Sequence, residues 1–169
     1  DQGYTYRISK EGELIWKEKM SETEFWASPV VDPENGFGLI GNVSNSLMKF
    51  DLITGKMQRN WLFSDDSELY SSGTLVDDIF YFTDGEGDKL IAISMITDEI
   101  IWTFDIGYAA YSTPVVSGDN IYFGSFEFTW CLPLEDPDGN GLITEDEVIW
   151  SSPTHDFQGG SSPVVAGER

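Results

Sequence analysis

The sequence predicts an all-β fold, a β-propeller built from four-stranded antiparallel blades. Two repeated markers support this prediction. Four tryptophans lie 45, 41 and 48 residues apart: Trp16, Trp61, Trp102 and Trp150. A second marker, seen first as Ser28-Pro29-Val30-Val31, returns at positions 73, 113 and 162, at intervals of 45, 40 and 49 residues. Because the two markers keep nearly the same spacing, the chain contains a structural repeat of the length of a propeller blade.

Within each repeat the sequence predicts short strands separated by turns. β-Branched and aromatic runs bounded by Gly, Asp and Asn are typical of strand-and-turn structure. The predicted strands are 3–8 and 14–18, then 47–52 and 58–63, then 79–82, 90–93 and 99–104, then 112–116 and 120–125. The segment 11–25 is rich in Lys and Glu, but its apolar residues do not recur at helical spacing, so no helix is predicted there.

The repeats divide one domain into blades. We expect a partial blade at 1–22, complete blades at about 23–63, 64–107 and 108–156, and a partial blade at 157–169 whose first strand is Ser162–Val165. This is about four blades' worth, and we expect it to form part of a larger propeller. A small closed ring, or two copies completing one larger ring, are the alternatives. Open blade edges predict self-association.

The composition excludes several classes of protein. The chain has 169 residues, 30 Asp plus Glu against 9 Lys plus Arg, and a formal net charge of −21. Such an acidic chain repels phosphate, which argues against nucleic-acid binding. No apolar run is long enough for membrane insertion. Its single cysteine, Cys131, and single histidine, His155, exclude an internal disulfide and His-pair chemistry. We expect His155 to lie in an exposed loop.

The repeat motifs resemble those of a known family. Ser-Pro-Val-Val, the pair Gly124-Ser125, the turn Thr54-Gly55 and the tryptophan that follows resemble the repeats of PQQ-like propellers. That family contains quinoprotein alcohol dehydrogenases and non-enzymatic relatives, including the outer-membrane assembly lipoprotein. The resemblance implies that the four repeat tryptophans dock between blades. The chain departs from the family pattern where Thr74 replaces the strand proline.

One insertion carries a chemical motif. Residues 136–147 match an EF-hand-type calcium loop, with Gly141 at its central turn and Ile143 at the position that usually makes a short β contact. The predicted ligands, at loop positions 1, 3, 5, 7, 9 and 12, are Asp136, Asp138, Asn140, Leu142 (through its carbonyl), Thr144 and Glu147.

The predicted ion is calcium. Six to eight oxygen ligands in flexible geometry suit Ca²⁺ better than Mg²⁺, which prefers a near-octahedral site. Strands, and not the usual helices, are predicted on both sides of the loop, so we expect a structural clip on a hairpin. A solvated acidic turn without an ion is the alternative. Calcium binding favours an extracytoplasmic location (periplasmic, cell-surface or secreted). There the sequon at Asn42 would also become relevant to glycosylation.

Two main functional hypotheses follow. The first is a non-enzymatic, calcium-binding propeller scaffold that binds a protein or a surface polymer. The second is a fragment of a PQQ-dependent dehydrogenase whose catalytic residues lie outside this chain. A repeat array that only spaces or adheres is a third. PQQ is not expected as a cofactor, because no Asp or Glu matches a quinoprotein catalytic motif and Cys131 has no adjacent cysteine.

Overall fold

The computed structural model describes residues 3–64, 67–153 and 161–166, and these form two compact units, Asp1–Ser72 and Gly73–Arg169. We describe each unit by itself and call them unit 1 and unit 2. His155 and part of the last two predicted blades lie outside the described residues. No helix in the described part of the chain is long and apolar enough to cross a membrane.

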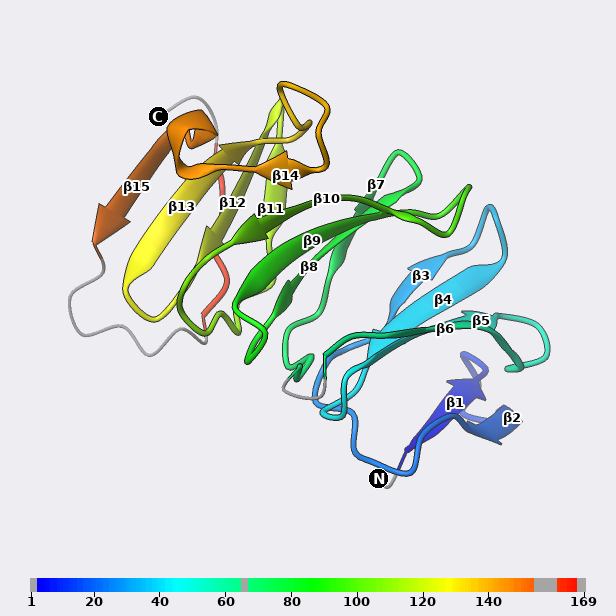
Figure 1. Cartoon of the computed structure of the whole chain (residues 1–169). Helices are drawn as coiled ribbons and strands as arrows, with labels where there is room; N and C mark the ends of the chain where they lie inside the picture. The colour runs from blue at the N-terminus through cyan, green and yellow to red at the C-terminus, as the bar shows by residue number, and fades with distance from the viewer. Residues whose placement is uncertain (1–2, 65–66, 154–160, 167–169) are drawn as a thin grey trace. The chain divides into compact units, whose positions relative to one another are not determined.

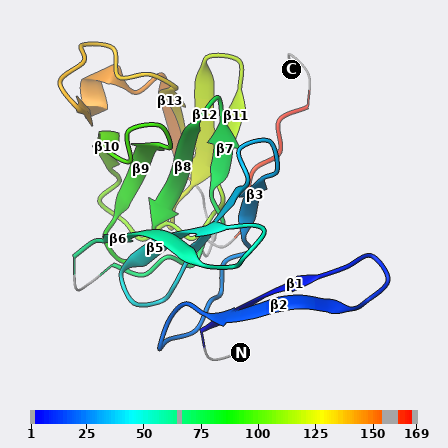
Figure 2. The ribbon, with the colours of Figure 1, turned by 90° about the vertical axis from the view of Figure 1, so that its right-hand side faces the viewer.

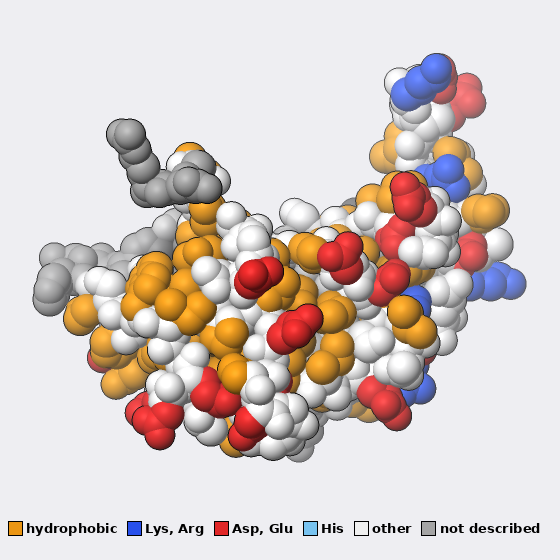
Figure 3. Space-filling view, turned by 90° about the horizontal axis from the view of Figure 1, so that it is seen from above, with side chains coloured by type: hydrophobic (Ala, Val, Ile, Leu, Met, Phe, Trp, Pro, Cys, Tyr) orange, Lys and Arg blue, Asp and Glu red, His pale blue; other side chains and the backbone are white. Residues whose placement is uncertain are grey.

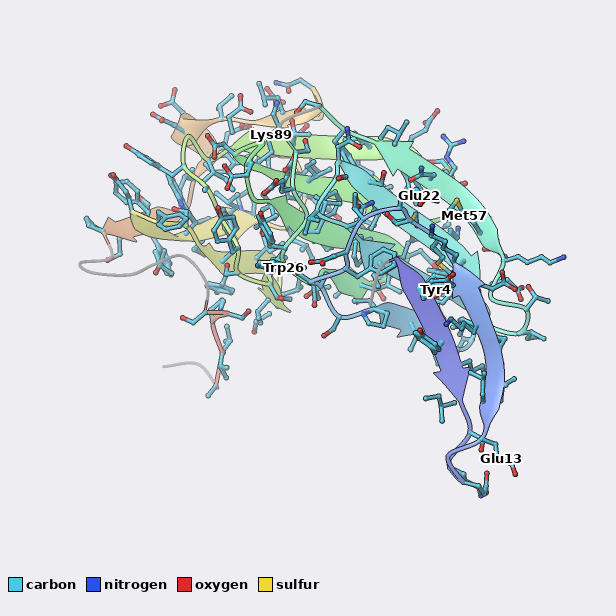
Figure 4. All side chains as sticks on the ribbon, turned by 90° about the horizontal axis from the view of Figure 1, so that it is seen from below. Tyr4, Glu13, Glu22, Trp26, Met57 and Lys89 are labelled. Carbon is cyan, nitrogen blue, oxygen red and sulfur yellow. The ribbon has the colours of Figure 1, made fainter. Side chains whose placement is uncertain are left out.

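Unit 1 contains a hairpin and one four-stranded sheet (Figure 1). In the hairpin, β1 (Tyr4–Ile8) pairs antiparallel with β2 (Leu14–Lys19), and Glu13 lies near its tip in Figure 4. The antiparallel sheet has the order β3 (Val30–Asp32), β4 (Phe37–Gly41), β5 (Ser46–Asp51) and β6 (Met57–Leu62). This up-and-down order of consecutive strands is that of a propeller blade.

Unit 2 contains two further blades. The first joins β7 (Thr74–Val76), β8 (Ile79–Asp84), β9 (Lys89–Ser94) and β10 (Ile100–Asp105). The second joins β11 (Val115–Ser117), β12 (Asn120–Gly124), β13 (Phe128–Pro133) and β15 (Trp150–Pro153). Between β13 and β15 lie β14 (Leu142–Ile143) and a single 3₁₀ turn, η1 (Glu145–Glu147). The predicted all-β fold of four-stranded antiparallel propeller blades is therefore confirmed.

The first strand of each blade is shorter than its sequence marker. β3 and β11 begin after the proline, at Val30 and Val115. Proline has no N–H to donate, so regular pairing starts one residue later. The first strands of unit 2, β7 and β11, lie side by side in Figure 2. There the Thr74 hydroxyl donates a hydrogen bond to the Pro114 carbonyl, which gives a structural role to the residue that replaces proline.

The strand predicted at Ser162–Val165 is wrong. Residues 161–166 have no regular secondary structure, and five of the six residues are exposed, whereas a strand requires a hydrogen-bonded neighbour. Within the described residues, no second strand follows to pair with this segment. The segment contacts the chain just before β11, where the Thr113 N–H donates to Ser162 Oγ at 2.9 Å.

The repeat tryptophans occupy different environments. Trp16 has the predicted docking role, since its indole N–H donates to the Leu52 carbonyl at 3.0 Å and its ring lies against Gly55 on the next sheet of unit 1. Trp102 is 1% exposed in the core of unit 2. Trp150 is 44% exposed and its ring packs on Tyr122 of its own sheet; docking on a following blade stays a prediction, because most of 157–169 lies outside the described residues.

Candidate metal centre

The candidate loop is held at both ends by one hairpin. β13 leads into it and β15 leads out of it, and the two strands pair antiparallel with Cys131 opposite Trp150. Strands therefore flank the loop on both sides, as the sequence predicts, and the 3₁₀ turn η1 replaces the exit helix of an EF-hand. The loop thus begins and ends on two paired strands of one sheet, which limits the separation of its two halves.

Three carboxylates from the two halves of the loop come together. One oxygen from each of Asp136, Asp138 and Glu147 lies within 4.8 Å of the others. The Gly141 N–H donates to Asp136 Oδ2 at 2.6 Å, and this hydrogen bond is the main reason that the pKa of Asp136 lies below its ordinary value. Asp136 is therefore ionised at neutral pH. Clustered charges of one sign repel each other, so this arrangement favours a bound cation.

The other predicted ligands are placed by hydrogen bonds inside the loop. Asn140 donates its amide N–H to Asp138 Oδ2 at 2.8 Å and accepts the Leu142 N–H at 2.8 Å. The backbone N–H and the hydroxyl of Thr144 both donate to Glu147 Oε2, at 2.8 and 3.0 Å. The structure thus connects Asn140 and Thr144 to the carboxylate cluster, and it fixes the backbone at Leu142, whose carbonyl is the predicted ligand.

The sequence does not reveal where the centre of the loop attaches. β14 pairs in parallel with β10 of the preceding blade, with Thr103 opposite Leu142 and Phe104 opposite Ile143. The Thr103 N–H donates to the Gly141 carbonyl at 3.1 Å. Ile143 is 1% exposed and belongs to the core of unit 2. The short β contact expected of Ile143 therefore adds a fifth strand to the neighbouring blade, and the loop joins the two blades of unit 2.

The donor set fits a hard divalent cation. All six predicted ligands offer oxygen, three of them as carboxylates, which suits Ca²⁺. Within the described residues, none of the Lys–carboxylate ion pairs involves Asp136, Asp138 or Glu147. No Lys or Arg among these residues thus neutralises the negative charge of the cluster.

Two other sequence features are structural. Asn42, the sequon residue, is 4% exposed, and its side-chain amide donates to Ser21 Oγ at 2.8 Å and to Thr23 Oγ1 at 3.2 Å. A buried amide with these contacts leaves no room for an oligosaccharide. Cys131 is 1% exposed, and burial raises the pKa of its thiol. It is a small core residue and not a reactive thiolate.

Comparison with known proteins supports the fold. No protein-family model matches the chain, and no curated protein matches it in sequence. Among solved structures, BamB from Moraxella catarrhalis is similar with a TM-score of 0.69 and 16% identity, over 90% of this chain and 43% of that one. The β-propeller domain of Cps50 (Swd1) from Myceliophteria thermophila has a TM-score of 0.69 and 12% identity, over 91% of this chain and 49% of that one.

An enzyme is also among the similar structures. The quinohemoprotein alcohol dehydrogenase ADHIIG from Pseudomonas putida HK5 has a TM-score of 0.60 and 17% identity, over 76% of this chain and 20% of that one. The chain therefore spans less than half the length of these solved structures. At such low identities the likeness shows the fold alone. The chain is a β-propeller of four-stranded antiparallel blades.

Proposed function

We propose that this chain is a non-enzymatic, calcium-binding β-propeller scaffold that binds a protein or a surface polymer. The observation that carries the proposal is the convergence of Asp136, Asp138 and Glu147, at positions 1, 3 and 12 of the calcium motif, in a loop attached to two blades. Calcium would be held by these carboxylates together with Asn140, Thr144 and the Leu142 carbonyl. The ion would neutralise the cluster and keep the loop in one conformation.

The proposed role of the ion is structural. The loop replaces the short turn of the other blades and pairs with β10, so ordering it stabilises the contact between the two blades of unit 2. The fold is compatible with a scaffold as well as with an enzyme, because BamB, the Cps50 propeller domain and an alcohol dehydrogenase are all similar to this chain in structure. An extracytoplasmic location is part of the proposal, since calcium is abundant there.

Isothermal titration calorimetry with CaCl₂ tests the calcium site directly. We expect one bound ion per chain, and we expect Asp136→Asn and Glu147→Gln each to weaken binding at least about tenfold. Asp146→Asn is the matched control, because it removes the same charge from the same loop at a position that is not a predicted ligand. The absence of heat on titration, or an equal effect of all three variants, would contradict the site.

The likeness to the quinohemoprotein dehydrogenase supports a second candidate, a fragment of a PQQ-dependent enzyme. Addition of PQQ with Ca²⁺ to the full-length protein that contains this chain tests it through tryptophan fluorescence and dye-linked alcohol oxidation, because the catalytic residues of such an enzyme would lie outside the chain. The scaffold proposal predicts neither quenching nor turnover. Saturable quenching by PQQ together with turnover would favour the enzyme.

A further inference from the structure

The negative charge of the molecule is concentrated in unit 2. Of the 30 acidic residues, 18 lie in 73–169, and the basic residues of that segment are Lys89 and Arg169. Figure 3 shows hydrophobic and acidic side chains together over this unit, on the left of the view. A surface that combines aromatic and carboxylate groups attracts cations that carry an apolar stem.

Unit 2 also contains a cavity of about 730 Å³ beside the calcium loop. Phe128 and Trp130 line it from alternate positions of β13, so they lie on one face of the sheet, with ring centroids 5.3 Å apart. Tyr108 lines it from the segment after β10, and its ring lies 6.0 Å from that of Phe128. Three neighbouring aromatic side chains thus line one hollow, whose volume lies in the range of small ligand sites.

Two acidic residues also line the cavity. Asp105 lies at the end of β10 and is paired with Lys89 at 3.2 Å, in an exposed ion pair. Glu145 is the first residue of η1 and lines the cavity from the side of the calcium loop. An exposed ion pair contributes little and exchanges readily with other cations. The lining of the cavity therefore combines aromatic rings and aliphatic side chains, such as Val148, with two carboxylates.

We propose that this cavity binds a basic side chain, a lysine or arginine, of a protein partner. The rings of Tyr108 and Phe128 would contact the apolar stem and attract the cation through their faces, with the buried Trp130 behind them, and Glu145 would supply the opposite charge. The formal charge of unit 2 would steer a basic segment to the cavity and exclude acidic ones. The assignment rests on the proposed function, of which it specifies the partner chemistry and the residues of contact.

NMR titration of the full ¹⁵N-labelled chain in CaCl₂ tests this proposal. The probe is a capped pentapeptide, Gly-Ser-Lys-Ser-Gly, compared with peptides in which norleucine or glutamate replaces lysine. We expect the lysine peptide to shift the Trp130 indole and Tyr108 amide signals, and the norleucine peptide to bind at least about threefold more weakly. The glutamate peptide should leave both signals unchanged. Equal binding of the lysine and norleucine peptides, or no shift at these two residues, would overturn the proposal.

Matched variants separate the cavity from general charge attraction. We expect Glu145→Gln and Tyr108→Leu each to weaken binding of the lysine peptide about threefold. Asp146→Asn removes a charge next to Glu145 but outside the cavity lining, and it should have little effect. Tyr108→Leu keeps an apolar side chain while removing the aromatic face, and unchanged signals from β8 and β9 would show that the variant is folded. Equal weakening by Glu145→Gln and Asp146→Asn would overturn the site.

Calcium binding is measured on the same samples. If Ca²⁺ binds and the peptides do not, this inference fails and the proposed calcium scaffold stands. If the lysine peptide binds the cavity and Ca²⁺ does not bind the loop, the calcium part of the proposed function fails and the basic-side-chain site stands.

Discussion

A residue type predicts a role, but its neighbours decide whether the residue can perform it. Trp16 and Trp150 occupy equivalent places in the repeat, yet Trp16 docks on a neighbouring sheet and Trp150 is 44% exposed. Their own sequence neighbourhoods are alike, so the difference could not be predicted locally. Trp130, by contrast, is not one of the repeat tryptophans, yet it is buried, with 8% of it exposed. Its place on an inner strand indicates core packing, and the spacing of the four repeat tryptophans does not report it.

The docking of Trp16 can be tested at the glycine that it contacts. A Cβ at Gly55 would lie 2.7 Å from the Trp16 ring, whereas a Cβ at Gly12 would meet no atom within 4 Å. Both glycines have positive φ, of 75° and 88°, so alanine is strained at either position. We expect Gly55→Ala to lower the free energy of unfolding by at least about 1 kcal/mol more than Gly12→Ala. Equal losses in urea unfolding would show that Trp16 does not dock there.

The raised pKa of Tyr81 leads us to expect a loss of stability at alkaline pH. Burial is the main cause that raises its pKa to about 12, from an ordinary value of 10.0. The folded state therefore retains the proton more strongly than the unfolded state, so the contribution of Tyr81 is complete below pH 10 and is lost between pH 10 and 12. At pH 11 we expect this term to lower the free energy of unfolding by about 1 kcal/mol.

Tyr81→Phe cannot ionise, so it should lose less stability than the wild type between pH 9 and pH 11 in urea unfolding. Other tyrosines and the lysines titrate in both proteins and cancel in the difference. The same loss in the wild type and in Tyr81→Phe would contradict the assignment.

At the scale of elements, the positions of the strands were more predictable than the pairing between them. The predicted and observed strands agree closely at β5, β6, β9 and β10, because β-branched and aromatic runs end at Gly and Asp turns. The pairing of β14 with β10 was not predictable, since it joins segments far apart in the chain by two residue pairs. The segment at 162–165 has the right residues for a strand, but the described part of the chain supplies no neighbouring strand for it. Composition determines whether a segment can be extended, and the fold determines whether it is paired.

The attachment of the loop to β10 depends on Ile143. Its side chain is 1% exposed, whereas that of Leu142, the adjacent residue on β14, is 39% exposed. We expect Ile143→Ala to lower the free energy of unfolding by about 2–4 kcal/mol, because it leaves a cavity in the core of unit 2. Leu142→Ala is the control and should lose less than about 1 kcal/mol, since its carbonyl is unchanged.

Hydrogen exchange supplies a second readout for the same pair of variants. The Thr103 amide donates to Gly141, so it should exchange faster in Ile143→Ala than in Leu142→Ala. An unchanged exchange rate at Thr103 would mean that β14 does not hold the loop on β10.

The net charge of the whole molecule affects its stability. A net charge of −21 destabilises the compact state through self-repulsion, and monovalent salt screens this repulsion. We expect the melting temperature without calcium to rise by about 5 °C between 10 and 500 mM NaCl, as measured by circular dichroism. A melting temperature that is constant or falls with salt would show that the acidic residues are too far apart to repel each other.

The β-propeller fold was predictable from the sequence as a whole, because two markers with matching intervals report a repeat that no single segment reveals. The convergence of Asp136, Asp138 and Glu147 was likewise predictable, because the spacing of the loop places them at positions 1, 3 and 12 of one motif. The cavity at Tyr108, Phe128 and Glu145 was not predictable, since its lining comes from segments that only the packing of two blades brings together.

The most direct test of the account is thermal melting of the full chain in excess EDTA, followed by addition of CaCl₂ or of MgCl₂ at equal ionic strength. We predict that Ca²⁺ raises the melting temperature by several degrees, that Mg²⁺ raises it much less, and that Glu147→Gln abolishes the difference, because an ion that binds only the folded loop stabilises it by mass action. Identical melting curves in EDTA, Ca²⁺ and Mg²⁺ would contradict the claim that residues 136–147 form a calcium site.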